Sequence, residues 1–252
     1  NQPLAMCYTI RPFLINIDKD KDRLKSITEM LNRAGIDFKR ISAITPASMK
    51  HIRINIEFDT YYSSACVPAN LISHLKALSA FITYGKKNNE FALILEDDAT
   101  PSPTLTSENL QKILASAPAN FDILQLGTSN LRQSEYLINY RNKSGLLWHN
   151  WHYPLWGTHA YLITNRAAAR IVEKLFLNME LNLKPFFCPD LCVADFLLYF
   201  QNNTYTSTYP WFGQLRMDST VRSETINDEI EMMQKRNEFL RSCWSNPPGF
   251  DK

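Results

Sequence analysis

Three consecutive acids, Glu96-Asp97-Asp98, are the residues of this chain whose types and spacing best suit chemistry. They directly follow the apolar run at 91–95, which is typical of a buried strand. Carboxylate oxygens are preferred ligands of hard cations such as Mg²⁺ and Mn²⁺, and these cations also bridge phosphate oxygens. The triplet therefore indicates a metal site that handles a diphosphate. Taken alone, it leaves a solvated acidic turn open as the alternative.

Strands and helices are expected to alternate around this triplet. Because alternation of this kind predicts a mostly parallel sheet covered by helices on both faces, ligands should bind at the carboxyl ends of the strands, where the acids lie. Asp22 is expected to cap the first helix and Gly35 to end it, while Asn165 is expected to cap a later one. The expected strands are 9–17, 38–44, 91–95, 121–126 and 158–163, and the expected helices are 22–35, 68–85, 107–115, 166–175 and 224–243.

Composition bounds the class of protein. The chain has 252 residues, enough to bury the core of one large α/β domain. Its 27 basic and 25 acidic residues nearly cancel, which gives no electrostatic reason to expect a nucleic-acid partner. Five cysteines are an odd number for a complete disulfide framework and favour a reducing compartment. No apolar run is long enough for a membrane span.

Several further blocks accompany the acidic triplet in the same order along the chain. With them the chain resembles glycosyltransferase family 25, which includes bacterial lipooligosaccharide galactosyltransferases and animal collagen galactosyltransferases. The resemblance extends over residues 10–222. Its blocks are Phe13-Leu14-Ile15-Asn16-Ile17-Asp18, Ser73-His74-Leu75-Lys76-Ala77-Leu78, Leu93-Ile94-Leu95-Glu96-Asp97-Asp98, Trp156-Gly157-Thr158-His159-Ala160-Tyr161-Leu162-Ile163, Val193-Ala194-Asp195-Phe196-Leu197 and, more weakly, 214–221.

This resemblance implies a GT-A fold, a Rossmann-like sheet with an acidic metal motif, and an inverting transfer from a UDP-hexose, with UDP-galactose the first choice and UDP-glucose the second. Mn²⁺ or Mg²⁺ would be the cofactor, held by Asp98 and by Glu96. Donor contacts would come from five positions: Asn16, Arg23, Lys76, Glu96 and Asp97. A surface helix residue is the alternative for Arg23, and which acid of the triplet does which task stays open because adjacent extended residues point in opposite directions.

An inverting transfer also needs a base that removes the proton of the acceptor hydroxyl. Asp195 matches the second carboxylate position of the family, and Asp190 is the alternative because the spacing here departs from the family pattern. The alternative for both Asp195 and Asp190 is a structural role, either as a helix cap or as an acid in a salt bridge. His74 and His159 are expected to be structural or core residues.

The residue types alone also allow interpretations of a cysteine pair and of an aromatic segment. Cys188 and Cys192 lack a second pair at zinc spacing and are expected to be core thiols. The aromatic segment 148–156 either stacks on a sugar ring or forms part of the core.

The domain expectation is a GT-A domain at 1–222 followed by a helical tail at 223–252 that packs on it. The acceptor is expected to be a glycan or a glycoprotein, and the location the cytoplasm, with peripheral association at the inner face of a membrane or, alternatively, the secretory lumen. A non-catalytic carbohydrate-binding or adhesion module of the same fold is the alternative function, but loss of the acidic motif would mark it. A nucleotidyltransferase is disfavoured because no Gly-rich phosphate loop occurs.

Overall fold

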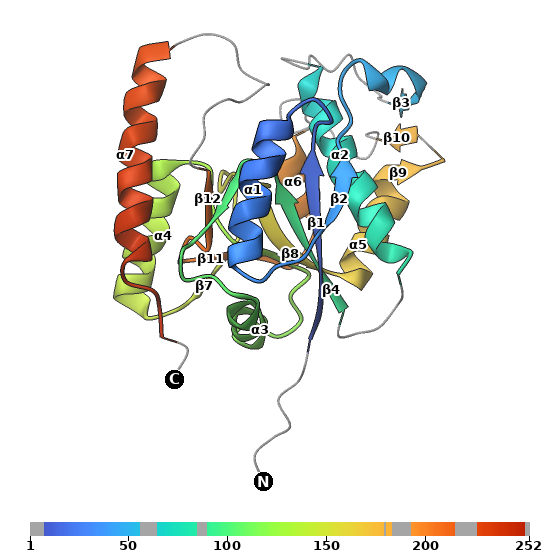
Figure 1. Ribbon diagram of the computed structural model, residues 1–252. Helices are drawn as coiled ribbons and strands as arrows, with labels where there is room; N and C mark the ends of the chain where they lie inside the picture. The colour runs from blue at the N-terminus through green and yellow to red at the C-terminus, as the bar shows by residue number, and fades with distance from the viewer. Residues whose placement is uncertain are drawn as a thin grey trace.

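Among the described residues, a mixed sheet of seven strands forms the centre of the protein, in the order β2-β1-β4-β8-β6-β11-β7 (Figure 1). The computed structural model describes residues 8–55, 65–84, 90–178, 180–182, 193–214 and 226–249. Five strands share one direction: β1 (Thr9–Asn16), β2 (Lys39–Ser42), β4 (Glu90–Glu96), β6 (Ile123–Gln125) and β11 (Thr204–Ser207). The other two, β8 (Ala160–Thr164) and β7 (Trp148–Asn150), run against their neighbours. The expected mostly parallel α/β sheet is therefore confirmed.

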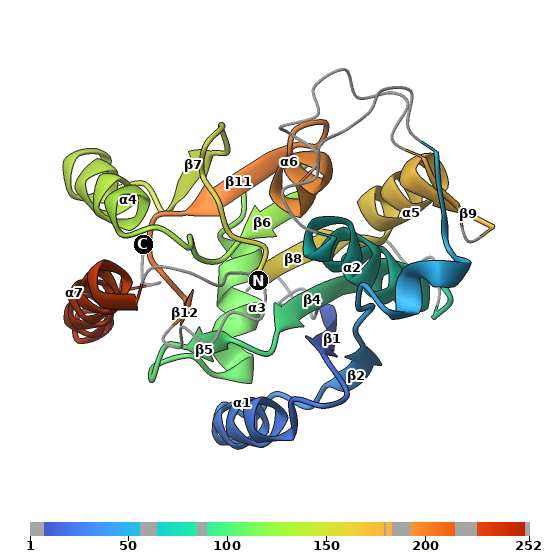
Figure 2. The ribbon, with the colours of Figure 1, turned by 90° about the horizontal axis from the view of Figure 1, so that it is seen from above.

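Helices cover both faces of this sheet, as the view along it shows (Figure 2). One face carries α1 (Lys21–Arg33), α3 (Ser107–Ala115) and α7 (Ile226–Trp244), and α4 (Leu131–Ser144) packs beside α7. The opposite face carries α2 (Cys66–Ile82), α5 (Asn165–Leu175) and α6 (Ala194–Tyr199). Two hydrophobic clusters, one on each face, fill the space between the layers.

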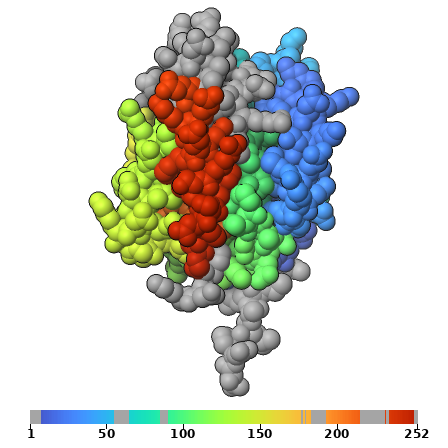
Figure 3. Space-filling view, turned by 60° about the vertical axis from the view of Figure 1, so that its left-hand side comes forward, coloured from blue at the N-terminus to red at the C-terminus, as the bar shows by residue number. Residues whose placement is uncertain are grey.

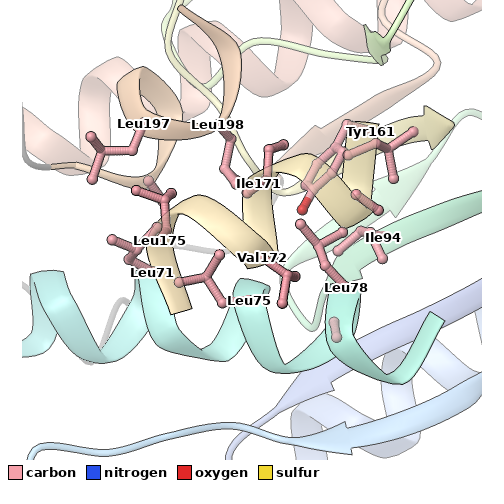
Figure 4. Packing of buried hydrophobic residues seen from close by; sticks show 14 of the residues in the cluster. Leu71, Leu75, Leu78, Ile94, Tyr161, Ile171, Val172, Leu175, Leu197 and Leu198 are labelled. Carbon is pink, nitrogen blue, oxygen red and sulfur yellow. The ribbon is translucent and has the colours of Figure 1, made fainter. Parts of the chain in front are cut away.

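The alternation of side chains along β4 explains why both clusters exist. Leu93 and Leu95 point into the cluster with α1 and α3, whereas Ile94 points into the cluster with α2 and α5. On the second face, α2 and α5 bring leucine and isoleucine side chains into direct contact (Figure 4). A strand buried on both faces holds its carboxyl end rigidly, and the acidic triplet starts at that end.

Two small sheets extend the frame. β5 (Ala99–Pro101) pairs antiparallel with β12 (Phe212–Gln214) directly after the acids, and β10 (Glu180–Asn182) joins β3 (Arg53–Asn55) to β9 (Phe176–Leu177). A short 3₁₀ helix at Ser48–His51 follows β2. Within the described ranges, no helix combines the length and the apolar character that a membrane span requires.

Local details differ from the sequence expectations at two helix starts. The first helix begins at Lys21 with Asp20 as N-cap, so Asp22 lies in the first turn and does not cap it. The later helix is capped by Thr164, whose hydroxyl accepts from the amide of Ala167, and not by Asn165. Gly35 does end α1 as expected, because its φ of +66° is a conformation that favours glycine.

Candidate active site

The acidic triplet lines a pocket at the carboxyl ends of β1 and β4. These strands are parallel neighbours, and their register places Ile15 beside Glu96. Asn16, Arg23 and all three acids therefore reach the same pocket. Its opposite wall comes from α2 and from the segment after β2: Ala43, Ile44, Thr45, Pro46, Cys66, Ala69, Asn70 and Ser73.

Glu96 is the most firmly held of the three acids. Its Oε1 accepts a 2.7 Å hydrogen bond from the Thr158 hydroxyl and lies 3.3 Å from Nε2 of His74, while its Oε2 lies 3.4 Å from the Asn70 amide nitrogen. Burial opposes ionisation of this carboxyl, but the hydrogen bond and charge of His74 and the bond from Thr158 lower its pKa to about 2. Glu96 is thus a fixed carboxylate.

Asp97 is held by two of the expected donor residues. Its Oδ2 accepts a 2.7 Å hydrogen bond from the amide of Asn16, and its Oδ1 lies 2.6 Å from a guanidinium nitrogen of Arg23. Burial nevertheless raises the pKa of Asp97, and the Arg23 charge and the Asn16 bond only partly offset it. These contacts orient Asn16 and Arg23 around the acids.

Asp98 is the least satisfied acid. Its Oδ2 accepts a 3.1 Å hydrogen bond from Gln214 and lies 3.5 Å from Arg23, whereas its Oδ1 is shielded from water and has no hydrogen-bond partner among the described residues. Burial raises the pKa of Asp98 to about 7, and repulsion by Glu96 adds to the effect. Ionisation of Asp98 would be favoured by a further cation beside its Oδ1.

A series of polar contacts, from Ser42 through Asp18 to Arg40, holds Asn16 in place. Arg40 on β2 donates from Nε to Oδ1 of Asn16 at 2.9 Å and pairs with Asp18 at 2.5 Å. Ser42 donates to the other oxygen of Asp18 at 2.8 Å. Because Asn16 is only 2% exposed, its amide nitrogen is locked toward Asp97.

Lys76 lies beside these contacts, where its ammonium group donates a 2.8 Å hydrogen bond to the backbone carbonyl of Ser42. Lys76 itself belongs to α2, and it is not among the residues that line the pocket.

The expected base, Asp195, lies in the first turn of α6. Its Oδ1 accepts a hydrogen bond from the backbone amide of Gly157, directly before the Thr158 that holds Glu96. Burial raises the pKa of Asp195 to about 6, and repulsion by the Glu96 carboxylate adds to the rise; Asp195 is not among the residues that line the pocket. Asp190 lies outside the described residues, as do Cys188 and Cys192.

The divalent cation implied by the resemblance fits the chemistry of these acids. Among the residues that the structure describes, no group of three or more His, Cys, Asp or Glu side chains is arranged as a complete metal site. The Oδ1 of Asp98 is nevertheless a hard oxygen ligand that is shielded and has no hydrogen-bond partner among the described residues, while Arg23 approaches only its Oδ2. A cation there would share its coordination between Asp98 and groups brought by a substrate.

Sequence reasoning missed several contacts of the triplet. Thr158 lies in one of the blocks that resemble the family, but its bond to Glu96 was not predicted. Asn70 is a polar residue on the otherwise apolar face of α2 and contacts Glu96. Gln214 lies on β12, more than a hundred residues after Asp98, to which it donates a hydrogen bond. His74, expected to be structural, is fully buried between Glu96 and the hydroxyl of Tyr161, 3.2 Å from its Nδ1. His159 is fully buried, and burial lowers its pKa to about 4, as for a neutral core histidine.

The aromatic segment 148–156 contains both core and exposed side chains. Trp151 packs against the core and donates a 2.8 Å hydrogen bond to the Leu155 carbonyl, whereas Tyr153 is 52% exposed and meets Trp156 edge to face at 5.0 Å.

One protein-family model matches the chain. A sequence model described as glycosyltransferase family 25 (LPS biosynthesis protein) matches residues 9–182, a range that contains Asn16, Arg23 and the acidic triplet. A search of curated protein sequences finds no match.

Three solved structures are similar at low identity. One is a glycosyltransferase involved in glycosylation of the major capsid of PBCV-1: 11% identity, 91% of this chain and 99% of that one, TM-score 0.34. A second is a Drosophila β-1,4-galactosyltransferase 7 mutant with manganese, UDP-Gal and xylobiose: 10% identity, 97% and 84%, TM-score 0.35. The third is Mycobacterium tuberculosis glucosyl-3-phosphoglycerate synthase with Mn²⁺, UDP and phosphoglyceric acid: 9% identity, 96% and 80%, TM-score 0.34.

Proposed function

The chain belongs to glycosyltransferase family 25, and on this premise we propose that it moves a hexose from a UDP-sugar to an acceptor hydroxyl, with inversion at the anomeric carbon and with the help of Mn²⁺ or Mg²⁺. The observation that carries the proposal is the state of Asp98: a shielded carboxylate with an unpartnered oxygen, in a pocket that Asn16 and Arg23 also line. Most buried polar side-chain atoms have a hydrogen-bond partner, and among the three acids of the triplet only Asp98 has a shielded oxygen without one in the described part of the chain.

Asp98 would hold the cation, and Glu96 is the second candidate ligand. A divalent cation bound there would neutralise negative charge that develops on the leaving diphosphate. Both oxygens of Glu96 already contact protein groups, which leaves less room for a metal bond. Glu96 is therefore proposed to contact the ribose or the sugar of the donor rather than the metal. Asp98 is thus the ligand that the contacts favour.

The donor side of the proposal rests on Asn16, Arg23 and Asp97. The planar guanidinium of Arg23 stands between two acids and has the fork geometry that suits phosphate oxygens. Asp97 keeps Arg23 and Asn16 oriented, since it contacts both. Lys76, also expected to meet the donor, stays a weaker candidate because its ammonium group is bonded to the Ser42 carbonyl.

Asp195 is the proposed base, with Asp190 as the alternative. In the transfer, the acceptor oxygen attacks the anomeric carbon while its proton passes to the Asp195 carboxylate. The bond from the anomeric carbon to the diphosphate oxygen breaks, and its electron pair leaves with UDP. A pKa of about 6 keeps Asp195 ionised yet basic near neutral pH, which is the range that general-base catalysis needs.

The identity of the hexose and of the acceptor is proposed from the family. Galactose is the first donor sugar and glucose the second, and the description of the family as LPS biosynthesis proteins favours a bacterial glycan acceptor over a glycoprotein. A cytoplasmic location, with peripheral association at a membrane that carries such an acceptor, is consistent with this proposal.

Proton NMR of donor hydrolysis tests the proposal without knowledge of the acceptor, because water can replace it. UDP-galactose and UDP-glucose are each incubated with Mn²⁺ and the protein, and the free sugar that forms first is recorded. The proposal predicts the β anomer from one donor, and none from Asp98→Asn. First formation of the α anomer would contradict inversion, and no sugar from either donor would contradict the proposed hexose donors.

A further inference from the structure

Arg236, on α7, lies beyond the matched family range of 9–182 yet reaches the edge of the acidic site. Its two terminal nitrogens donate to the backbone carbonyls of Ser129, at 2.8 Å, and of Gln214. Gln214 is the residue whose side chain bonds Asp98. The guanidinium of Arg236 is therefore one residue removed from the least satisfied acid of the triplet.

The docking of α7 fixes Arg236 in this place. Arg236, Leu240 and Trp244 are spaced four residues apart and so share one face of the helix. Leu240 and Trp244 are buried, the indole of Trp244 donates to the Pro210 carbonyl at 2.6 Å, and both side chains lie against Gly213. In the space-filling view α7 lies between α4 and the segment that follows β4 (Figure 3). Arg236 thus faces the domain and not the solvent.

The charge of Arg236 has no matched partner. Among the described residues it makes no ion pair with a carboxylate, and its contacts are the two neutral carbonyls. Its Nε is shielded and has no hydrogen-bond partner. Burial lowers the pKa of Arg236, and the negative charge of Asp98 opposes that effect. A partly buried cation without a hydrogen-bonded anion is costly unless a ligand completes it.

Asp98 and Arg236 are unsatisfied in complementary ways. Oδ1 of Asp98 is shielded and has no hydrogen-bond partner, and among the described residues the guanidinium of Arg236 donates only to neutral carbonyls, with its Nε unpartnered. A diphosphate that carries a divalent cation would satisfy both at once, since the metal meets the carboxylate and the phosphate oxygens meet the guanidinium. A lone metal ion would satisfy Asp98 and repel Arg236.

We propose that Arg236 is a donor-binding residue that contacts the diphosphate of the nucleotide-sugar, and that α7 is therefore part of the active site. This inference rests on the proposed function. It adds to Arg23 a second arginine, one that reaches the acids' surroundings from the side of β12.

Calorimetric titration of UDP and of uridine in the presence of Mn²⁺ tests the role of Arg236. Uridine lacks phosphate, so it reports on the nucleoside pocket alone. Arg236→Gln is expected to weaken UDP binding roughly 10- to 100-fold, the usual effect of a lost hydrogen bond to a charged group, and to leave uridine binding unchanged. Arg236→Lys, which keeps the charge, is expected to bind UDP with intermediate affinity and also covers the case in which the glutamine variant does not fold. Arg241→Gln, on the exposed side of the same helix, is the matched control and should bind both as the wild type does.

The outcomes separate this inference from the function on which it rests. Unchanged UDP binding by Arg236→Gln, or an equal loss of UDP and uridine, would overturn the inference, because the residue would then be idle or merely structural. Failure of the wild-type protein to bind UDP with Mn²⁺ would instead overturn the proposed function, and the inference would fall with it.

Discussion

Replacement of Asp98 by asparagine is expected to stabilise the folded protein while it removes activity. The carboxylate of Asp98 is shielded, is repelled by Glu96 and leaves Oδ1 without a hydrogen bond among the described residues. Asparagine has nearly the same shape, can still accept the bond from Gln214 and carries no charge. The change therefore removes an unfavourable charge without leaving a cavity.

The size of the effect follows from the raised pKa of Asp98. Its rise from an ordinary 3.8 to about 7 corresponds to an upper bound of about 4 kcal/mol at pH above both values, since one pKa unit is worth about 1.4 kcal/mol. The carboxyl is 17% exposed and water will relax around it, so roughly half of that bound, about 2 kcal/mol, is the expected gain. For a chain of this length that gain corresponds to a melting temperature roughly 4–8 °C higher.

The pH dependence has a definite sign. Because the folded pKa of Asp98 is raised, the wild-type protein loses stability as pH increases from about 4 to about 7, while Asp98→Asn does not lose this share. The two proteins should thus melt alike near pH 4 and differ most near pH 8.

Thermal unfolding with a chelator, which keeps divalent cations from Asp98, measures this difference at several pH values. Glu108→Gln, at an exposed position on α3, is the control and should show no such pH-dependent gain. An Asp98→Asn protein that melts below the wild type at pH 8 would refute the reasoning, since the carboxylate would then be stabilising.

Three further predictions concern other parts of the molecule. Asp122→Asn should lower the free energy of unfolding by about 1–3 kcal/mol at neutral pH, because the buried carboxylate accepts bonds from Arg166 and Arg170. Since these bonds and that of a backbone amide outweigh burial and lower the pKa of Asp122, the difference from wild type should vanish in urea titrations as pH falls through that lowered pKa. Gly127→Ala should cost about 3 kcal/mol or prevent folding, because its Cβ would lie 2.0 Å from a backbone carbonyl oxygen on β12; circular dichroism melts measure this, and a wild-type melting temperature would contradict it. Asp195→Asn should lower kcat by about 10²–10⁴ with UDP affinity unchanged, whereas a parallel loss of affinity would argue against a base.

The sequence predicted the helices and strands whose apolar residues recur at regular spacing or form a continuous run. The run at 91–95 and the acids after it appear as a strand that ends at Glu96, because a fully apolar segment followed by charges has few other ways to fold. α4 was not expected, since only Ser134 and Leu137 of its residues are buried and a polar helix leaves no stripe to recognise. The antiparallel direction of β8 was likewise hidden, because strand direction depends on topology and not on local pattern.

Only the part of the candidate site that lies at the ends of strands β1 and β4 was predictable from the sequence. Asn16 and the acids lie at the ends of neighbouring parallel strands, where sheet geometry alone brings side chains together. Thr158 and Gln214 reach the acids through tertiary packing across 60 residues or more, and Arg236 contacts only the Gln214 carbonyl beside them; no local signal in the sequence marks such contacts.

The most direct test of the central claim is release of UDP from UDP-hexoses by the wild-type protein and by Asp98→Asn, with Mn²⁺ and with chelator. Glu108→Gln serves as the matched acid outside the site. The account predicts release from one donor that requires both Mn²⁺ and Asp98 and that the control variant retains. Release that persists with chelator or in Asp98→Asn would contradict the assignment of the acidic triplet, and no release from any donor would contradict the proposed UDP-hexose transfer.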